Sequence, residues 1–320
     1  MSDEQPVTLA ADLGGTTIKL GVVRAGRVLA QGAIDAASRG GIAAKLPEIE
    51  ATWRGLMASA GVDAARQVAG VGMAFPSLID PKTHVITSTN DKYPDAKGFD
   101  LAAWARGAFG VPIAVENDAN AALAGEWQYG AGRGCRSCVI MTLGTGVGTS
   151  AVVDGVPLRG QHGQAGCLGG HFIVNAFGRA CTCGGVGCVE TEASSWALPA
   201  IARAHPGFER SRLAGEGRID FAAVFQLAGE GDVVARELRD RSIRVWSASA
   251  VNLVHAYDPE VVILAGGVMR SPEPTLSMMQ KFIDDHAWVG WGRVRVVRGE
   301  LGDAAALLGV SYLASVATAR

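Results

Sequence analysis

The sequence predicts an α/β protein of two lobes, each built on a mixed β-sheet. At 320 residues the chain is too long for one typical hydrophobic core. A hairpin motif also occurs twice, because residues 11–23 (ADLGGTTIKLGVV) and 141–153 (MTLGTGVGTSAVV) share Leu, Gly, Val and Val at equivalent positions. In each half, consecutive strands come first, and alternating strands and helices follow. We therefore expect two related lobes that arose from one repeated unit.

The expected elements follow from apolar periodicity and from turn residues. Strands are expected at residues 7–12, 19–24, 27–33, 68–73, 112–115, 138–143, 149–153 and 261–265. Helices are expected over 42–60, up to 109, over 119–127 and 232–257, and from about 303. Residues 1–118 should form the N-terminal lobe and 119–302 the C-terminal lobe, which carries a Gly- and Cys-rich module at 160–190. The last helix, about 303–320, should pack back on the N-terminal lobe.

Composition excludes several classes of protein. Hydrophobic residues make up 48% of the chain and the mean hydropathy is +0.20, so a buried core is expected and disorder is not. The net charge is -2 without a basic block, which argues against a nucleic-acid or membrane partner. The acidic start is unlike a signal peptide, and no apolar run reaches the ~20 residues that span a bilayer. We expect a cytoplasmic protein, whose six cysteines are reduced or metal-bound.

The tips of the two repeated hairpins are candidate phosphate-binding loops. Glycine lets backbone N–H groups approach an anion closely, and threonine adds hydroxyl donors. The residues concerned are Gly14, Gly15 and Thr16 in the first copy, and Gly144, Thr145 and Gly146 in the second. Gly-tipped hairpins without a ligand are common, so a single copy would be weak evidence. Two copies favour two lobes that hold one polyphosphate from both sides.

Two aspartates follow apolar strands and are candidates for the chemistry. Asp12 could hold Mg²⁺ through water, although it could also cap the glycine turn. Asp118 opens a helix within Glu-Asn-Asp-Ala-Asn, where it could act as a general base for phosphoryl transfer to a hydroxyl. The structural alternative is a helix N-cap at Asn117 or Asp118. Neither a Walker loop nor the protein-kinase motifs occur in the chain.

Three cysteines within eight residues, Cys181, Cys183 and Cys188, are the strongest metal signal. Their thiolates can converge around a zinc ion, and His171 is the expected fourth ligand of a closed, structural Cys₃His site. Cys135 and Cys138 have C-x-x-C spacing but no nearby ligand pair in sequence. These two cysteines and Cys167 are interpreted as packed thiols. His162 and His255 are interpreted as surface or core residues.

Together these residues resemble the ROK family of bacterial sugar kinases and sugar-responsive repressors, within the hexokinase and actin-like ATPase superfamily. The resemblance covers nearly the whole chain. It depends on the motifs DLGGT (12–16), ENDAN (116–120), LGTGVG (143–148), GH (170–171), CTCGGVGCVE (181–190), AGGV (265–268) and GDAAA (302–306). It implies an actin-like ATPase (ribonuclease H-like) fold with a duplicated βββαβα core and a zinc-bearing loop.

The resemblance also implies roles for individual residues. Asp118 would be the catalytic base, with substrate ligands at Asn117, His171, Glu190 and Asn90. MgATP would be held by Asp12, Gly14, Gly15, Thr16, Lys19, Gly144, Thr145, Gly146, Gly266 and Gly267. The segments 265–268 and 302–306 look like the family's adenosine-side motifs. Structural Zn²⁺ would be bound by His171, Cys181, Cys183 and Cys188.

The chain departs from the family pattern at two places. The family usually has Glu-x-Gly-His before the zinc cysteines, and its glutamate binds the sugar. Here Leu168 occupies that position when counted back from His171, whereas Cys167 occupies it when counted from Ala165-Gly166. The Gly-Pro-Gly expected after the fourth strand reads Phe75-Pro76-Ser77. Loss of a charged acceptor should change which sugar hydroxyls are tolerated.

These residues are compatible with three functions. The first is an ATP-dependent kinase acting on a hydroxyl, expected to be the 6-hydroxyl, of a hexose or hexose derivative. The second is a repressor, which we disfavour because only eleven residues precede Asp12 and leave no room for a helix-turn-helix. The third is a catalytically silent sugar sensor of the same family, suggested by the missing glutamate. Family analogy implies a homodimer or homotetramer.

Overall fold

The computed structural model describes residues 5–80, 82–89 and 91–318, which divide into two compact units. Unit 1 takes the described residues up to Gly134, Arg159–Ala165 and those from Glu300 onward, and unit 2 takes Cys135–Leu158 and Gly166–Gly299. The division falls after Gly134 and not after residue 118, because helix α4 (Asp118–Tyr129) packs along helix α10 (Ala305–Thr318). Residues 160–165, expected in the Cys-rich module, likewise belong to unit 1.

Both units contain a five-stranded sheet of the same topology. The strand order is β3-β2-β1-β4-β7 in unit 1 and β10-β9-β8-β11-β12 in unit 2. In each sheet the first three strands are antiparallel, and the last two lie parallel to the first. The predicted duplication is therefore confirmed. The strands are β1 (Val7–Leu13), β2 (Thr17–Arg24), β3 (Arg27–Asp35), β4 (Val68–Phe75), β7 (Ile113–Asn117), β8 (Cys138–Leu143), β9 (Val147–Val153), β10 (Val156–Pro157), β11 (Val261–Ala265) and β12 (Arg295–Arg298).

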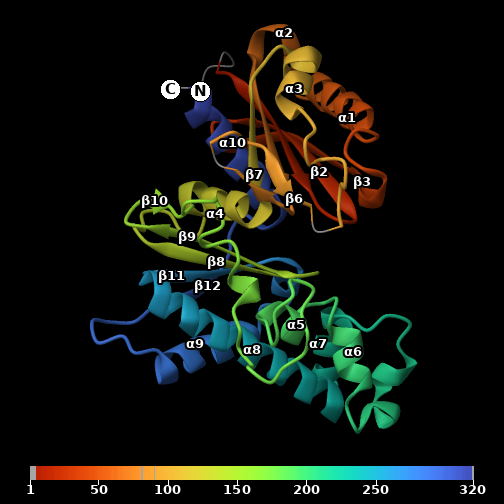
Figure 1. The fold of residues 1–320 in the computed structure, drawn as a ribbon, viewed down its shortest axis with the longest axis vertical. Coiled ribbons are helices and arrows are strands. Elements are labelled where there is room, and N and C mark those ends of the chain that lie inside the picture. The colour runs from red at the N-terminus through yellow and green to blue at the C-terminus, as the bar shows by residue number, and fades with distance from the viewer. Residues whose placement is uncertain (1–4, 81, 90, 319–320) are drawn as a thin grey trace. The chain divides into compact units, whose positions relative to one another are not determined.

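Helices cover both faces of the unit 1 sheet, and Figure 1 shows α1 and α3 on one side and α10 on the other. The remaining elements of the unit are α1 (Leu46–Ser59), α2 (Ala64–Gln67), α3 (Leu101–Phe109), a small hairpin of β5 (Leu78–Ile79) and β6 (Ile86–Ser88), and the short helices η1 (Ser38–Gly40) and η6 (Gly302–Ala304). Alternate residues of β1 point to opposite faces, so Leu9 and Ala11 pack with α1 whereas Ala10 packs with α10. Burial on both faces explains the continuous apolar runs of these strands.

The face toward α10 is built from small residues, which let backbones touch. A Cβ on Gly125 of α4 would lie 2.1 Å from Ala305 O, and one on Gly309 of α10 would lie 1.8 Å from Ala121 O. Both distances are far below van der Waals contact, so any side chain would force the helices apart. Glycine at these two positions is therefore a packing requirement of the α4–α10 contact.

A buried carboxylate in the last turn of α4 accepts hydrogen bonds from two separate chain segments. Glu126 is 0% exposed. Its Oε2 accepts hydrogen bonds from Ala131 N (2.9 Å) and Glu300 N (3.0 Å), and its Oε1 accepts one from Leu301 N (2.9 Å). These donors satisfy a charge that would otherwise be costly to bury. Glu126 thus fixes the places where the chain leaves unit 1 and returns to it.

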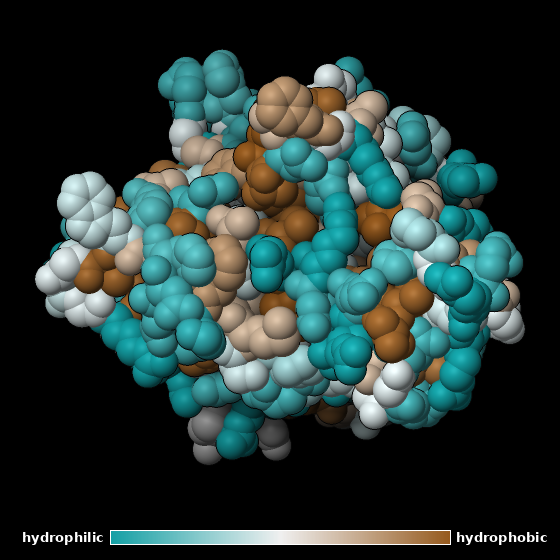
Figure 2. All heavy atoms as spheres, turned by 90° about the horizontal axis from the view of Figure 1, so that it is seen from below, coloured by the Kyte–Doolittle hydropathy of each residue, from teal (hydrophilic) through white to brown (hydrophobic). Residues whose placement is uncertain are grey.

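In unit 2, helix α8 (Val233–Tyr257) packs with the sheet and with the helices beside it. Trp246 of α8 is fully buried, and its Nε1 donates to Ala193 O (2.9 Å). The other helical elements are α5 (Val189–Ala193), α6 (Leu198–Arg203), α7 (Phe221–Gly229), α9 (Thr275–His286), η2 (Gly169–His171), η3 (Phe208–Arg210), η4 (Arg212–Gly215) and η5 (Gly267–Arg270). The face drawn in Figure 2 is mostly hydrophilic, with hydrophobic residues in small separate groups. Among the described residues, no helix has the length and apolarity to cross a bilayer.

The α4–α10 contact gives a direct stability test. Gly309→Ala should lower the free energy of unfolding by about 1–3 kcal/mol, because the added methyl group overlaps Ala121 O. Gly55→Ala is the matched control, since Gly55 lies in α1 and a methyl group added there would meet nothing within 4 Å. That control should raise stability by about 0.5–1 kcal/mol through helix propensity. Urea denaturation of both variants measures the difference, and equal effects would contradict the packing argument.

Candidate active site

Asp12 and Asp118 lie at the carboxyl edge of the unit 1 sheet. Asp12 is near the end of β1, and Asp118 begins α4 directly after β7. Strands β1, β4 and β7 are parallel, so their carboxyl ends meet at one edge, where ligands of α/β sheets commonly bind. Burial and the negative charge of Asp12 raise the pKa of Asp118 to about 6. Burial also raises the pKa of Asp12, against the opposing charge of Lys19.

Lys19 joins two acids that are distant in sequence. It lies on β2 opposite Asp12, and its Nζ is 3.7 Å from Asp12 Oδ2 and 2.7 Å from Asp303 Oδ1. Asp303 belongs to η6 in unit 1, whereas the Gly266–Gly267 turn belongs to unit 2. The segment 302–306, expected with the adenosine-side motifs, therefore contributes a carboxylate beside Asp12.

The carbonyl groups of the first glycine loop are held by hydrogen bonds, which turns the amide groups that follow them away from the donors. Its carbonyl oxygens all accept hydrogen bonds from unit 1: Gly14 O from Tyr93 Oη (2.7 Å), Gly15 O from Ser38 Oγ (2.9 Å) and Thr16 O from Ala36 N (2.9 Å). In a trans peptide the C=O and the following N–H point in opposite directions. The N–H groups of residues 15–17 are therefore directed away from these donors. Such a row of amides is suited to an anion.

Asn117 is the N-cap of α4, which was the structural alternative for this motif. Its Oδ1 accepts from Ala119 N (3.0 Å) and Asn120 N (3.2 Å), and its Nδ2 donates to Ser77 O (3.1 Å). The neighbouring Glu116 accepts from Asn117 N (2.9 Å) and from Asn120 Nδ2 (2.9 Å). Glu116 Oε2 also pairs with an Arg159 nitrogen at 2.6 Å, although 43 residues separate the two. This network fixes the turn that carries Asp118.

The second glycine loop is braced by Glu190 of α5. Glu190 Oε2 accepts from Val147 N (3.0 Å), and Glu190 Oε1 accepts from Trp196 Nε1 (3.3 Å). A Cβ on Gly146 would lie 2.5 Å from Glu190 Oε2, so glycine is needed for this approach. Ser195 N donates to Gly144 O (3.0 Å), and Trp196 N donates to Thr145 O (3.2 Å). The predicted sugar ligand thus also holds the loop of residues 144–147.

The Gly266–Gly267 turn follows β11 beside that loop. Gly266 has φ +91°, and a Cβ there would lie 2.4 Å from Leu143 O. A Cβ on Gly144 would lie 4.0 Å from Gly267 N. The structure therefore brings together the predicted nucleotide-binding glycines of unit 2.

His171, Cys181, Cys183 and Cys188 form one cluster, with ligand atoms that all lie within 4.8 Å of one another. Cys181 Sγ is 3.7 Å from His171 Nδ1, and Cys183 Sγ is 3.7 Å from Cys188 Sγ. A tetrahedral zinc ion with Zn–S bonds of about 2.3 Å keeps its sulfur ligands about 3.8 Å apart. The four residues fit zinc in number, type and spacing.

The loop that carries the cluster is anchored to helix α8. Glu192 of α5 is buried, accepts from Arg179 N (2.9 Å) and pairs with Arg241 of α8. Gly187 has φ +61°, and a Cβ there would lie 1.6 Å from Asn175 O. Ile173 and Phe177 of this loop are exposed, so a bound metal would add a constraint that packing of these side chains does not supply.

The cysteines outside the metal cluster and His255 have structural surroundings. Cys135 and Cys138 are both buried, and burial raises the pKa of Cys138 to about 12, so they are packed thiols as expected. Cys167 is half-buried. His255 is exposed and accepts a hydrogen bond from Trp288 N (2.9 Å). Asn90 lies outside the described residues.

Sequence reasoning did not single out Lys92 or Arg159, and it placed Asp303 in the motif 302–306 without a role of its own. Lys92 lies next to Gly15, because a Cβ on Gly15 would be 3.0 Å from Lys92 Cε. Each of the three comes from a different part of the chain, and only the tertiary fold brings them to this edge. In the sequence, Lys92 directly follows the polar pair Asn90-Asp91, and this local cluster of polar residues could have drawn attention to it.

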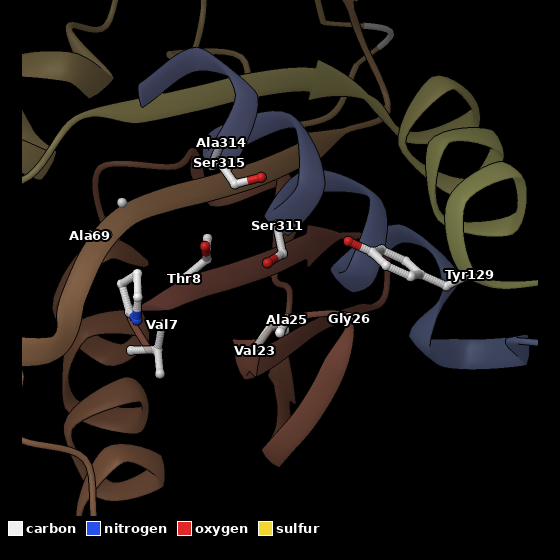
Figure 3. A pocket seen from close by; sticks show the side chains of 12 residues that line it. Val7, Thr8, Val23, Ala25, Gly26, Ala69, Tyr129, Ser311, Ala314 and Ser315 are labelled. Carbon is white, nitrogen blue, oxygen red and sulfur yellow. The ribbon is translucent and has the colours of Figure 1, made fainter. Parts of the chain in front are cut away.

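A separate cavity of about 230 Å³ lies elsewhere in unit 1. Figure 3 shows Thr8, Ser311 and Tyr129 among the side chains that line it. Val7 and Thr8 are at the amino end of β1, whereas Asp12 is near its carboxyl end. The cavity is therefore distinct from the candidate active site.

The metal cluster predicts one zinc ion per chain in purified protein. Chelation should lower the melting temperature, and Cys181→Ser should do the same, because the loop then loses its cross-link. Cys167→Ser is the matched control, since Cys167 is outside the cluster and should leave zinc content unchanged. Elemental analysis and thermal unfolding test this. Zinc-free protein with an unchanged melting temperature would contradict it.

Comparison with known proteins agrees with this architecture. The ROK family model matches residues 8–317. A glucokinase from Thermotoga maritima is 31% identical over 314 residues, which cover 95% of this chain and 96% of that protein. A ROK family glucokinase from Streptomyces griseus, solved with glucose and AMPPNP, has a TM-score of 0.79 at 30% identity and covers 97% of this chain and 99% of its own. A xylose repressor from Bacillus spizizenii is 25% identical over 76% of this chain and 60% of the repressor.

The actin-like ATPase fold class and the family resemblance are thereby confirmed. The family model spans nearly all described residues, and the 31% identical glucokinase aligns over almost its full length. On these grounds the chain belongs to the ROK family.

Proposed function

We propose that the protein is an ATP-dependent carbohydrate kinase, which transfers the γ-phosphoryl group to a hydroxyl of a hexose or hexose derivative. The 6-hydroxyl is the proposed acceptor. The observation that supports this most strongly is Asp118, a half-buried acid whose pKa is raised to about 6, at the same sheet edge as Asp12 and the amide groups of residues 15–17. The full-length similarity to glucokinases supports the same class of reaction.

In the proposed reaction Asp118 acts as general base. The acceptor hydroxyl oxygen forms a bond to the γ-phosphorus while the bond from that phosphorus to the β–γ bridging oxygen breaks. The hydroxyl proton passes to the Asp118 carboxylate, and ADP leaves with the bridging oxygen. A pKa near neutrality suits this role, because the group is ionised at physiological pH yet basic enough to accept the proton.

The glycine loops are proposed to bind the phosphates of ATP. In unit 1 these are Gly14, Gly15 and Thr16, and in unit 2 they are Gly144, Thr145, Gly146 and the Gly266–Gly267 turn. Asp12 would hold Mg²⁺, whose preferred ligands are oxygens, and the ion would neutralise phosphate charge when bound. Lys19 keeps Asp12 and Asp303 in place through its two contacts. Its position supports an indirect role in nucleotide binding.

The proposed sugar ligands are Asn117, Glu190, His171 and Asn90. Each carboxylate oxygen of Glu190 accepts one protein hydrogen bond and has further acceptor capacity. Asn117 Nδ2 donates to Ser77 O and has a second N–H. His171 Nδ1 faces Cys181 in the metal cluster, which leaves Nε2 for a sugar hydroxyl.

A second candidate is a sugar-binding sensor without catalysis. It is favoured by the absence of a glutamate at Cys167 and Leu168, and by the similarity to a xylose repressor. A sensor would bind a sugar without any use for a general base. Thermal stabilisation by a sugar, with no ADP formed from MgATP across a sugar panel, would favour this candidate.

Asp118→Asn should remove sugar-dependent ADP release by a factor of about 10²–10⁴, the usual contribution of a general base. The variant should be at least as stable as the parent at pH 7.5, because an ionised, desolvated carboxylate is replaced by a neutral amide. Asp285→Asn, on the exposed face of α9, should leave turnover unchanged. Coupled-assay kinetics and thermal unfolding measure both effects, and full activity in Asp118→Asn would exclude the proposed base.

The pH dependence follows from the raised pKa of Asp118. The group accepts a proton only when ionised, so kcat/KM should be level above about pH 6 and fall tenfold per pH unit below it. The charged groups that act on Asp118 are Asp12, which raises its pKa, and Lys92, which lowers it. A pH profile of kcat/KM between pH 4.5 and 8.5 tests this. An acid limb near pH 4 would show that Asp118 titrates as an ordinary aspartate.

A further inference from the structure

Lys92 is held rigidly beside the first glycine loop. The next residue, Tyr93, is fully buried, donates from its backbone N to Ser38 O (2.7 Å) and donates from its hydroxyl to Gly14 O (2.7 Å). Tyr93 also packs edge-on against Phe75 at 5.9 Å between ring centroids. These contacts fix the backbone at Lys92 with respect to the loop.

The backbone here is strained, which indicates that the position is imposed by its surroundings. Tyr93 has φ +51°, in the left-handed region that bulky side chains rarely adopt, and Asp91 on the other side of Lys92 has φ +58°. Such conformations cost of order 1–3 kcal/mol each and persist when neighbouring contacts hold them. At Tyr93, the hydrogen bonds to Ser38 and Gly14 hold this conformation.

The side chain of Lys92 crosses the face of Gly15. A Cβ on Gly15 would lie 3.0 Å from Lys92 Cε and 3.6 Å from Lys92 Nζ. The missing side chain of Gly15 therefore makes room for the lysine. The ammonium group also acts electrostatically on Asp118, whose pKa it lowers. Lys92 thus lies close to both the proposed phosphate loop and the proposed base.

Lys92 differs from Lys19 in the way its charge is balanced. Lys19 contacts the carboxylates of Asp12 and Asp303. Within residues 5–80, 82–89 and 91–318, Lys92 has no carboxylate within 4 Å of Nζ. A half-buried ammonium beside a row of amides is a site for an anion.

We propose that Lys92 is a further catalytic residue, whose ammonium binds the phosphoryl group as it moves from ATP to the acceptor hydroxyl. This inference rests on the proposed kinase function. Charge on the transferred group is spread over its oxygens during transfer, and a fixed cation stabilises that charge. Lys92 lies beside Gly15 of the proposed phosphate loop and acts electrostatically on Asp118, so its charge is available to a group that passes from one to the other.

The test compares Lys92→Met with Lys92→Arg and with Lys97→Met, an exposed lysine of the same segment. Lys92→Met should lower kcat about 10²–10³-fold and change the KM for sugar less than threefold. Lys92→Arg should recover part of kcat, and Lys97→Met should match the parent. A rise in sugar KM with unchanged kcat would overturn the proposal, because Lys92 would then bind an anionic sugar substituent.

Nucleotide binding provides a readout that does not depend on turnover. Lys92→Met should weaken binding of the magnesium complex of AMPPNP about tenfold, with ADP binding changed less than twofold. Equal losses for both nucleotides, or none, would overturn the proposal. Gly15→Ala should act in the same direction, since its methyl group displaces the lysine. If the parent protein forms no ADP with any sugar, the kinase function fails, whereas the nucleotide comparison still decides the role of Lys92.

Discussion

The backbone contact between helices α4 and α10 determines much of unit 1. Gly125 and Gly309 bring the two helices closer than any other residue would allow. Asp118 begins α4, and Asp303 lies just before α10, so the same contact sets the position of an acid at the start of each helix. Stability and chemistry are therefore linked here: a methyl group placed between the helices would shift Asp118 and Asp303 with respect to Asp12.

The two sheets have the same strand topology, but the two units carry different functional groups. Asp12 near the end of β1 corresponds to Thr142 near the end of β8, so the repeat in unit 2 lacks the acid. Unit 1 holds the interacting charges of Asp12, Lys19 and Asp118. Unit 2 instead holds its glycine loop with Glu190, two residues after the metal cluster. The same sheet topology thus carries interacting charges at its edge in unit 1. In unit 2 it carries a glycine loop that Glu190 binds next to the metal cluster.

The sequence predicted those parts of the protein that are encoded locally. The repeated hairpins, the strand 261–265 and the long helix ending at Tyr257 agree with the structure, because apolar period and turn residues specify them. The cysteine cluster was equally readable, since all four ligands lie within 18 residues, from His171 to Cys188. Strand β12 was missed, because its four residues, Arg295–Arg298, form an edge strand whose only strong signal is pairing with β11. Long-range contacts also bring Lys92, Asp303 and Arg159 to this sheet edge. Asp303 lay in a predicted motif, but the local sequence does not specify its contact with Lys19.

Helix α10 has a consequence for the order of folding during synthesis. It fills one face of the unit 1 sheet, yet it is the last described helix to leave the ribosome. Until then Ala10, Ala74 and Leu307 cannot be buried together, and that face of the nascent sheet stays uncovered. Apart from one short excursion at 159–165, unit 2 is continuous in sequence and can form its core earlier. The unit that begins first is thus completed last, and the apolar face it exposes during synthesis is the kind of surface that favours aggregation.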